Sequence, residues 1–204
     1  MTGNLLITQH SIQKLYENKI TYYYAALNLL QILTENYKPW GKLIIIRDFK
    51  TPDMQITENE FFMQRCLQLA AEAKRKGKPA VGSVVVKDKV IISEGTEGES
   101  SLPPLLAHAE IVAILKAIQK LGTNDLFNCV LYTTVEPCYM CSYVIRETKI
   151  ARVIFGTKAG EIGGAFSSYP LLTTKAVSRW QTEILLEGGV LEEDCLQLLK
   201  KVKG

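Results

Sequence analysis

Two short stretches of the sequence, AHAEI at residues 107–111 and EPCYMCS at residues 136–142, contain residue types that bind metal ions. Cys138 and Cys141 are separated by two residues, and at the start of a helix this spacing directs both sulfurs at one ion. His108, from a neighbouring helix, completes three protein ligands. Catalytic zinc sites keep a fourth position for water, whereas structural sites close it with a fourth protein ligand. Because neither stretch has a further histidine or cysteine beside it, the sequence predicts an open, catalytic zinc site.

Glu110 lies two residues after His108 and is the candidate acid and base of this site. Helix N-termini favour thiolates over thiols, which helps the cysteines bind a metal at neutral pH. Bound zinc lowers the pKa of its water and so provides hydroxide as a nucleophile. At this spacing Glu110 does not share the ligand direction of the histidine. It can instead take the proton of that water and pass it to a ring nitrogen and then to a leaving amine.

Each motif alone is a weak signal. A single Cys-x-x-Cys also occurs in structural zinc half-sites and in redox pairs, and a histidine on a helix is often only a packed or capping residue. Their combination in this order, each at a junction between a strand and a helix, is much more specific. The sequence therefore favours a catalytic zinc over these alternatives.

Outward from these motifs, strands and helices alternate along the chain. Thr57 and Glu60 have the spacing of a capping box, which predicts a helix that ends near Gly77. Two β-rich runs separated by Asp88-Lys89 indicate a hairpin. The expected helices lie at 107–121, from 137 onward, around 171–177 and at 192–202, and the expected strands at 81–87, 90–93, 129–135, 152–155 and 182–186. The chain between the last two strands has room for a crossover helix, so these strands are expected to be parallel within a mixed sheet.

The first 55 residues show a different pattern. Apolar residues recur at spacings of three and four between residues 11 and 36, which predicts a helix, and residues 43–46 form a short β-branched run. Thr51-Pro52-Asp53 is typical of a turn or linker. We therefore expect a helical extension of unknown role at residues 1–55 and a separate domain at residues 56–204.

Composition limits the location and partners of the chain. It has 204 residues, 47% of them hydrophobic, and a formal net charge of +3, which is too mild to identify a nucleic-acid partner. Its five cysteines, an odd number, do not form a disulfide framework. No apolar run is long enough to cross a bilayer and no signal peptide is evident, so we expect a cytoplasmic location and no membrane partner. The basic run Lys74 to Lys78 is interpreted as a solvated helix end rather than as a phosphate-binding surface.

The motifs and their surroundings resemble the cytidine deaminase superfamily of CMP/dCMP-type zinc-binding deaminases. The His-x-Glu and Pro-Cys-x-x-Cys signature is that of the zinc deaminases, and the chain is most similar to the branch of bacterial tRNA adenosine deaminases and guanine deaminases. The resemblance extends over residues 57–202. It rests on the segments 81–86, 107–111, 136–142, 152–156 and 187–191.

The resemblance implies a three-layer α/β/α fold around a five-stranded mixed sheet whose last two strands are parallel. It also implies a Zn2+-dependent hydrolase that releases ammonia from the exocyclic amine of a nucleobase, nucleoside or related small heterocycle. In that family pattern His108, Cys138 and Cys141 hold the metal and Glu110 is the catalytic residue. Because the branch generally pairs through helices beside the active site, we expect a homodimer.

The chain departs from this branch at Glu97. In the branch a Gly-x-Asn segment often precedes the His-x-Glu motif, and its Asn hydrogen-bonds the base, whereas here the matching residues are Gly95-Thr96-Glu97. An Asn amide offers donors and an acceptor, but an ionised Glu only accepts hydrogen bonds. Glu97 therefore favours a small substrate that presents donors, such as a guanine-like or other amino-substituted ring. Val81 and Pro137 are the other candidate substrate-binding residues.

Three alternatives stay open. In the first, Glu97 turns to solvent and another residue contacts the base. In the second, the substrate is adenosine in tRNA, although residues 98–106 contain Glu99 and two prolines and no basic residue. In the third, the chain is a zinc-stabilised binding scaffold without catalysis, against which Glu110 argues because a structural site has no use for that carboxylate.

Overall fold

A computed structural model describes residues 56–99 and 102–200 of the chain. The helix predicted at 11–36, the strand predicted at 43–46 and the proposed extension at 1–55 lie outside the described residues.

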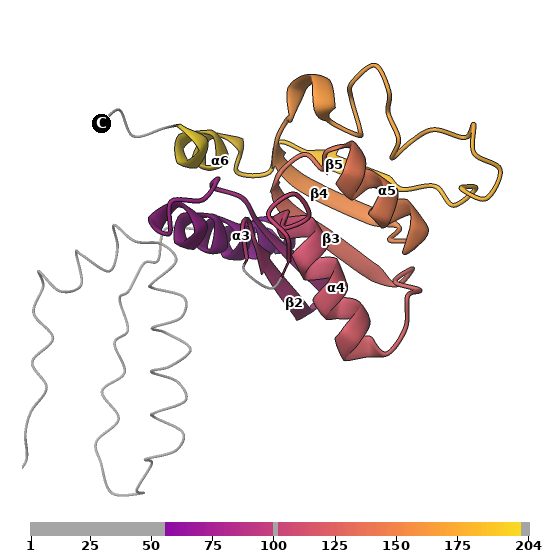
Figure 1. Cartoon of the computed structure of the whole chain (residues 1–204), viewed down its shortest axis with the longest axis horizontal. Helices are drawn as coiled ribbons and strands as arrows, with labels where there is room; N and C mark the ends of the chain where they lie inside the picture. The colour runs from indigo at the N-terminus through magenta and orange to yellow at the C-terminus, as the bar shows by residue number, and fades with distance from the viewer. Residues whose placement is uncertain (1–55, 100–101, 201–204) are drawn as a thin grey trace, which may run out of the picture. The chain divides into compact units, whose positions relative to one another are not determined.

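The centre of the domain is a five-stranded mixed sheet (Figure 1). Its strands follow one another in space in the order β2-β1-β3-β4-β5. The pairs β1–β2 and β1–β3 are antiparallel, whereas β3–β4 and β4–β5 are parallel, so the expected mixed sheet with its last two strands parallel is confirmed. The bounds are β1 Gly82–Lys87, β2 Val90–Thr96, β3 Cys129–Val135, β4 Arg152–Thr157 and β5 Leu185–Gly188.

The turn between β1 and β2 explains the hairpin. Asp88 and Lys89 have φ angles of 50° and 62°, in the left-handed region. Two consecutive residues of this kind match the right-handed twist of the flanking strands, which is why two-residue hairpin loops favour them. The hairpin predicted from the sequence is confirmed at this position.

Helices cover both faces of the sheet (Figure 1). Helices α3 (Glu58–Arg75) and α6 (Glu192–Leu199) pack on one face, and α4 (Ala109–Leu121) and α5 (Tyr139–Glu147) on the other. Side chains of a strand alternate between faces. In β1, Val84 and Val86 accordingly join the core under α3, while Val85 joins the core under α4 and α5. The result is the three-layer α/β/α fold.

The first helix of the domain begins where the capping box predicts. The Thr57 side chain accepts a hydrogen bond from the Glu60 amide, and the Glu60 carboxylate accepts one from the Thr57 amide. This reciprocal pair satisfies two amides that the first turn of a helix otherwise leaves without partners. At the other end, Gly77 takes a left-handed φ of 71° and ends the helical path.

The connection from β4 to β5 differs from the sequence prediction. Residues 158–184, all of which the structure describes, contain the short 3-10 helix η1 (Gly160–Ile162) and a turn at residues 171–173, but no α-helix around 171–177. The last strand covers 185–188 instead of the expected 182–186, and the final helix ends at residue 199 instead of 202.

The physical reason for the missing helix lies in α5. The guanidinium of Arg146 donates to the carbonyls of Leu171, Thr174 and Thr182 at 3.1, 2.5 and 2.6 Å. The carbonyls of Leu171 and Thr174 therefore point at a side chain, whereas in a helix they would accept from amides four residues later. None of the described helices is long and apolar enough to span a bilayer.

Candidate metal centre and active site

His108 is placed by a close approach between β2 and the start of α4. It is the N-cap residue of α4, with an extended backbone at φ −73° and ψ 142°. The approach depends on Gly95 in β2, because a Cβ there would fall well inside van der Waals distance of the Ala109 carbonyl oxygen and the Ala113 nitrogen. A glycine at this point lets the first turn of α4 lie directly on the sheet.

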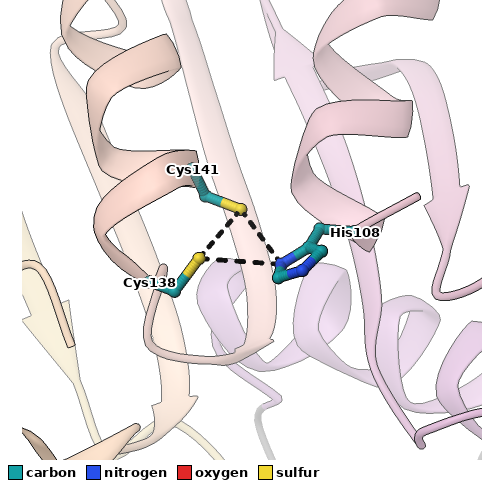
Figure 2. Close-up of side chains that lie close together, drawn as sticks. All are labelled: His108, Cys138 and Cys141. Atoms are coloured by element: carbon teal, nitrogen blue, oxygen red, sulfur yellow. Dashed lines mark hydrogen bonds between the residues drawn. The ribbon is translucent and has the colours of Figure 1, made fainter. Parts of the chain in front are cut away.

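Cys138 and Cys141 come from the start of α5 and face His108 across the gap between the two helices (Figure 2). The two sulfurs are 3.6 Å apart. His108 Nδ1 lies 3.6 Å from Cys138 Sγ and 3.5 Å from Cys141 Sγ. With Zn–S bonds of about 2.3 Å and Zn–N bonds of about 2.0–2.1 Å, a tetrahedral site places two sulfurs about 3.8 Å apart, and a sulfur and a nitrogen about 3.6 Å apart. The three side chains therefore fit a tetrahedral zinc ion.

The two thiols differ in acidity. The hydrogen bond between the two thiols lowers the pKa of Cys138 to about 5, and backbone amides at the start of α5 act in the same direction. The same hydrogen bond, followed by burial, raises the pKa of Cys141. A cation between the sulfurs favours both thiolates.

Glu110 lies in the first turn of α4, buried beside the sulfurs. Its Oε1 accepts a hydrogen bond from Thr133 Oγ1 at 3.2 Å, and Cys141 Sγ donates to its Oε2 at 3.6 Å. Burial raises the pKa of the Glu110 carboxyl to about 7. A carboxyl in this range can both take and give a proton near neutral pH, so the arrangement provides a proton carrier next to the candidate metal position.

Glu97 follows β2 and faces the same site. Its Oε2 accepts a hydrogen bond from the Ala109 amide at 3.1 Å, at the N-terminus of α4. Glu97, His108 and Glu110 each offer an atom within 4.8 Å of the others. Burial raises the pKa of Glu97, and the charge of His108 opposes this effect. One oxygen of Glu97 is thus occupied by the helix start, and no described residue donates a hydrogen bond to the other.

The two further substrate candidates take different positions. The Val81 carbonyl accepts from the Glu97 amide at 3.1 Å, so Val81 lies beside Glu97. Pro137 is buried, and its carbonyl accepts from the Gly164 amide at 2.8 Å and from Ser142 Oγ at 3.2 Å. Their contact with a substrate stays a prediction.

Glu136 is a site residue that the sequence analysis missed. It directly precedes Pro137 and is 2% exposed, and its carboxylate accepts three backbone hydrogen bonds from the β4–β5 connection. Next to it lies a cavity of about 760 Å3, whose walls include Tyr139, Lys158, Phe166 and Tyr169. The signal available in the sequence was an acidic residue at the end of an apolar strand. Its partners were not available, because they lie 23 to 30 residues further along the chain.

The basic run near the end of α3 is partly explained by packing. Lys74 Nζ donates to the Leu198 and Lys200 carbonyls at 2.6 and 2.9 Å. These carbonyls belong to the C-terminal end of α6, where a cation is favourable. Lys74 thus complements α6 rather than its own helix.

Comparisons with known proteins agree with this geometry. A family model described as the cytidine and deoxycytidylate deaminase zinc-binding region matches residues 56–157. A tRNA-specific adenosine deaminase of Streptococcus pyogenes serotype M18 is 33% identical over 145 residues, which cover 71% of this chain and 89% of that protein. Another tRNA-specific adenosine deaminase, from Aquifex aeolicus, is 34% identical over 144 residues, which cover 69% of this chain and 95% of that protein.

A solved structure is also similar. It comes from a study of A-to-I editing by tRNA:A34 deaminases at the wobble position of transfer RNA. It has a TM-score of 0.63 and 27% identity, covering 68% of this chain and 99% of that one. With a matching family region, relatives above 30% identity and a shared fold, the chain belongs to the cytidine and deoxycytidylate deaminase family of zinc-dependent hydrolases that act on C–N bonds.

Proposed function

We propose that this chain deaminates a small amino-substituted heterocycle that presents hydrogen-bond donors to Glu97. The observation that carries the proposal is the Glu97 carboxylate, which faces the His108 and Glu110 side chains. A ring N–H, an amino group or a sugar hydroxyl gains a charge-assisted hydrogen bond at this position. A ring acceptor is repelled there, and leaving the partly buried carboxylate unpaired is costly.

The chain's own residues account for the chemistry around the metal. His108, Cys138 and Cys141 would hold zinc, which supplies hydroxide as a nucleophile near neutral pH. Glu110 would carry one proton from the attacking water to the ring nitrogen and a second from the added hydroxyl group to the amine, which leaves as ammonia. Thr133 fixes the carboxylate through its 3.2 Å hydrogen bond to Oε1, which leaves Oε2 directed toward the sulfur side. Glu97 orients the ring by accepting from its donor edge.

The second candidate is adenosine in tRNA. The sequence relatives named above support it better than the first, because they are named tRNA-specific adenosine deaminases. The charges around the site favour the first candidate. Glu99, in the loop between β2 and α4, forms an ion pair with Lys116 at 2.8 Å, and the sequence of this loop has no basic residue. Within this loop a polyanionic strand therefore meets Glu97 and a neutralised ion pair.

Ammonia release from the zinc-loaded full chain tests both candidates. The panel contains free purine and pyrimidine bases, their nucleosides, and a tRNA with adenosine at the wobble position, with Glu110→Gln as the inactive control. We expect turnover of an amino-substituted base or nucleoside above that of the tRNA. Efficient deamination of the tRNA with no turnover of small substrates selects the second candidate. No turnover of any member, in a chain that holds zinc, selects the scaffold alternative.

We also propose a cytoplasmic homodimer. The apolar side chains of Leu105, Ile162, Phe166 and Tyr169, each more than half exposed in the single chain, support pairing. Light scattering of the full chain is expected to give twice the mass of one chain. A monomeric mass over a wide concentration range contradicts the dimer.

A further inference from the structure

A buried carboxylate outside the proton-transfer chemistry organises the β4–β5 connection. Oε2 of Glu136 accepts from the Ala159 amide at 3.1 Å, and its Oε1 accepts from the Ala165 and Phe166 amides at 2.8 and 3.0 Å. Because both oxygens are occupied by amides, the buried side chain has the hydrogen bonds that a charge needs in the interior. These bonds draw residues 159–166 around one point.

The same segment also contacts the turn that carries a metal ligand. Cys138 and Gly163 form an isolated antiparallel β-bridge, and the Gly164 amide donates to the Pro137 carbonyl at 2.8 Å. Gly164 also lies so close to Ser142 in α5 that a Cβ would overlap its side chain. Residues 163–164 therefore pack directly against Pro137 and Cys138, the two residues that follow Glu136 in sequence.

We propose that Glu136 is a positioning residue for the zinc site, which holds the β4–β5 connection against Pro137 and Cys138 and thereby keeps Cys138 in place to bind the metal. The inference rests on the assignment of Cys138 as a zinc ligand and is independent of which heterocycle is the substrate. Glu136 touches neither the metal position nor a reacting atom, so its effect passes through the backbone of the connection.

The chemistry requires a carboxylate at this position. Three amides donate to two oxygens, and both oxygens act only as acceptors. A glutamine amide keeps one acceptor and turns a donor toward at least one backbone N–H, so that a buried hydrogen bond is lost and a donor is left without a partner. Glu136→Gln is thus nearly equal in volume and changes the hydrogen bonding and the charge of the side chain, as Glu183→Gln changes charge at an exposed position.

The test measures zinc affinity and amide exchange in the full chain. Glu136→Gln is expected to weaken zinc binding, by competition with a chromophoric chelator, by about tenfold, the lower end of the range for residues that support metal ligands. Hydrogen exchange of residues 159–166 is expected to accelerate. The matched control is Glu183→Gln, which makes the same change at an exposed position of the same connection and should leave both readouts unaltered.

A second variant changes the other partner of the same contact, Gly163, which lies against the Glu136 carboxylate. Gly163 has an ordinary φ of −66°, so alanine fits its backbone, but a Cβ there would overlap the Glu136 carboxylate. Gly163→Ala is expected to weaken zinc binding in the same direction, and in the Glu136→Gln background it should add little, because both changes act on one contact. If Glu136→Gln does not fold, Gly163→Ala alone decides the question.

Two results would overturn the proposal. Zinc affinity within twofold of the parent, together with faster exchange of residues 159–166, would reduce Glu136 to a structural role. Unchanged exchange in both variants would show that the carboxylate does not hold the connection. Neither readout depends on turnover, so failure to find a substrate leaves this test intact.

Discussion

Glu110 joins two properties in one side chain: it is buried, and it lies against Thr133 and Cys141. In Glu110→Gln the amide retains a hydrogen-bonding group for Thr133 but neither takes nor gives the proton. We expect the variant to keep its zinc and its fold and to lose activity by about 10²–10⁴-fold, the usual contribution of a positioned acid or base. Ammonia release and metal content of the same preparation check this, and near-normal turnover would assign the proton transfer to another group.

Glu97 provides a separate prediction about substrate choice. In Glu97→Asn and Glu97→Gln the side chain gains donors, so substrates that present acceptors at this edge should improve relative to substrates that present donors. We expect the ranking of heterocycles to change more than zinc content, because Glu97 is bonded to the Ala109 amide and not to the three metal-binding side chains. Competition assays with paired substrates measure the ranking. An unaltered ranking in both variants would remove Glu97 from substrate recognition.

Individual residues differ in how far the sequence could predict them. His108, Glu110, Cys138 and Cys141 come from two local motifs, each at the start of a helix, and the structure brings all four together. Glu136 could not be predicted in this way. Its carboxylate is satisfied by backbone amides of a distant and irregular connection, and backbone amides leave no mark on the sequence.

At the scale of elements, the β4–β5 connection shows where the sequence prediction fails. A helix was expected around residues 171–177, but a short segment can equally pack as a turn when tertiary contacts satisfy its backbone. Arg146 provides those contacts through three carbonyl acceptors. By contrast, α3, the hairpin and β3 were predictable, because capping, turn and strand signals all lie within the elements themselves.

Arg146→Lys tests this account of the connection. A lysine has one compact ammonium group, whereas the guanidinium presents its donors in a planar fork that reaches several acceptors at once. We expect the free energy of unfolding of this variant to fall by about 2 kcal/mol or more, since hydrogen bonds to charged groups are worth ~1.5–3 kcal/mol each. Unfolding in denaturant measures this free energy. Arg179→Lys, on the exposed side of the same connection, is the control and should leave the midpoint nearly unchanged. Equal stability of both variants would contradict the role of Arg146.

At the scale of the whole molecule, the parallel half of the sheet explains where the site forms. The loop after β3 leads directly into Cys138 and α5, and the close contact at Gly95 brings the start of α4 beside it. Alternation of strands and helices predicted a mixed sheet with helices on its faces, whereas the three layers and the parallel last pair were expected from the family resemblance and from the length of the connection between those two strands. The bounds of β5 were less predictable, because its hydrogen bonds are made with β4 across the irregular connection.

This geometry makes the metal a link between two helices of one face. His108 belongs to α4, and Cys138 and Cys141 belong to α5, so a zinc ion would join them across the sheet surface. A ligand that binds only the folded state stabilises it by about 2.7 kcal/mol at a free concentration one hundred times its Kd. For a chain of this size that corresponds to roughly 5–10 °C in Tm. We therefore expect a strong chelator to lower the Tm of the full chain by about this amount, and zinc to restore it.

Cys138→Ala should abolish this response. With one ligand missing, the variant is expected to lose zinc and to show a Tm that neither zinc nor chelator changes, since the stabilisation comes from the metal link and not from the thiol itself. Cys129→Ala is the matched control. Cys129 is buried in β3, away from the ligand triangle, so this variant should keep its zinc and the full chelator response. Differential scanning fluorimetry with and without chelator, together with metal analysis, distinguishes the Cys138→Ala variant from the Cys129→Ala variant. Full zinc occupancy in Cys138→Ala would exclude Cys138 as a ligand and with it the link between α4 and α5.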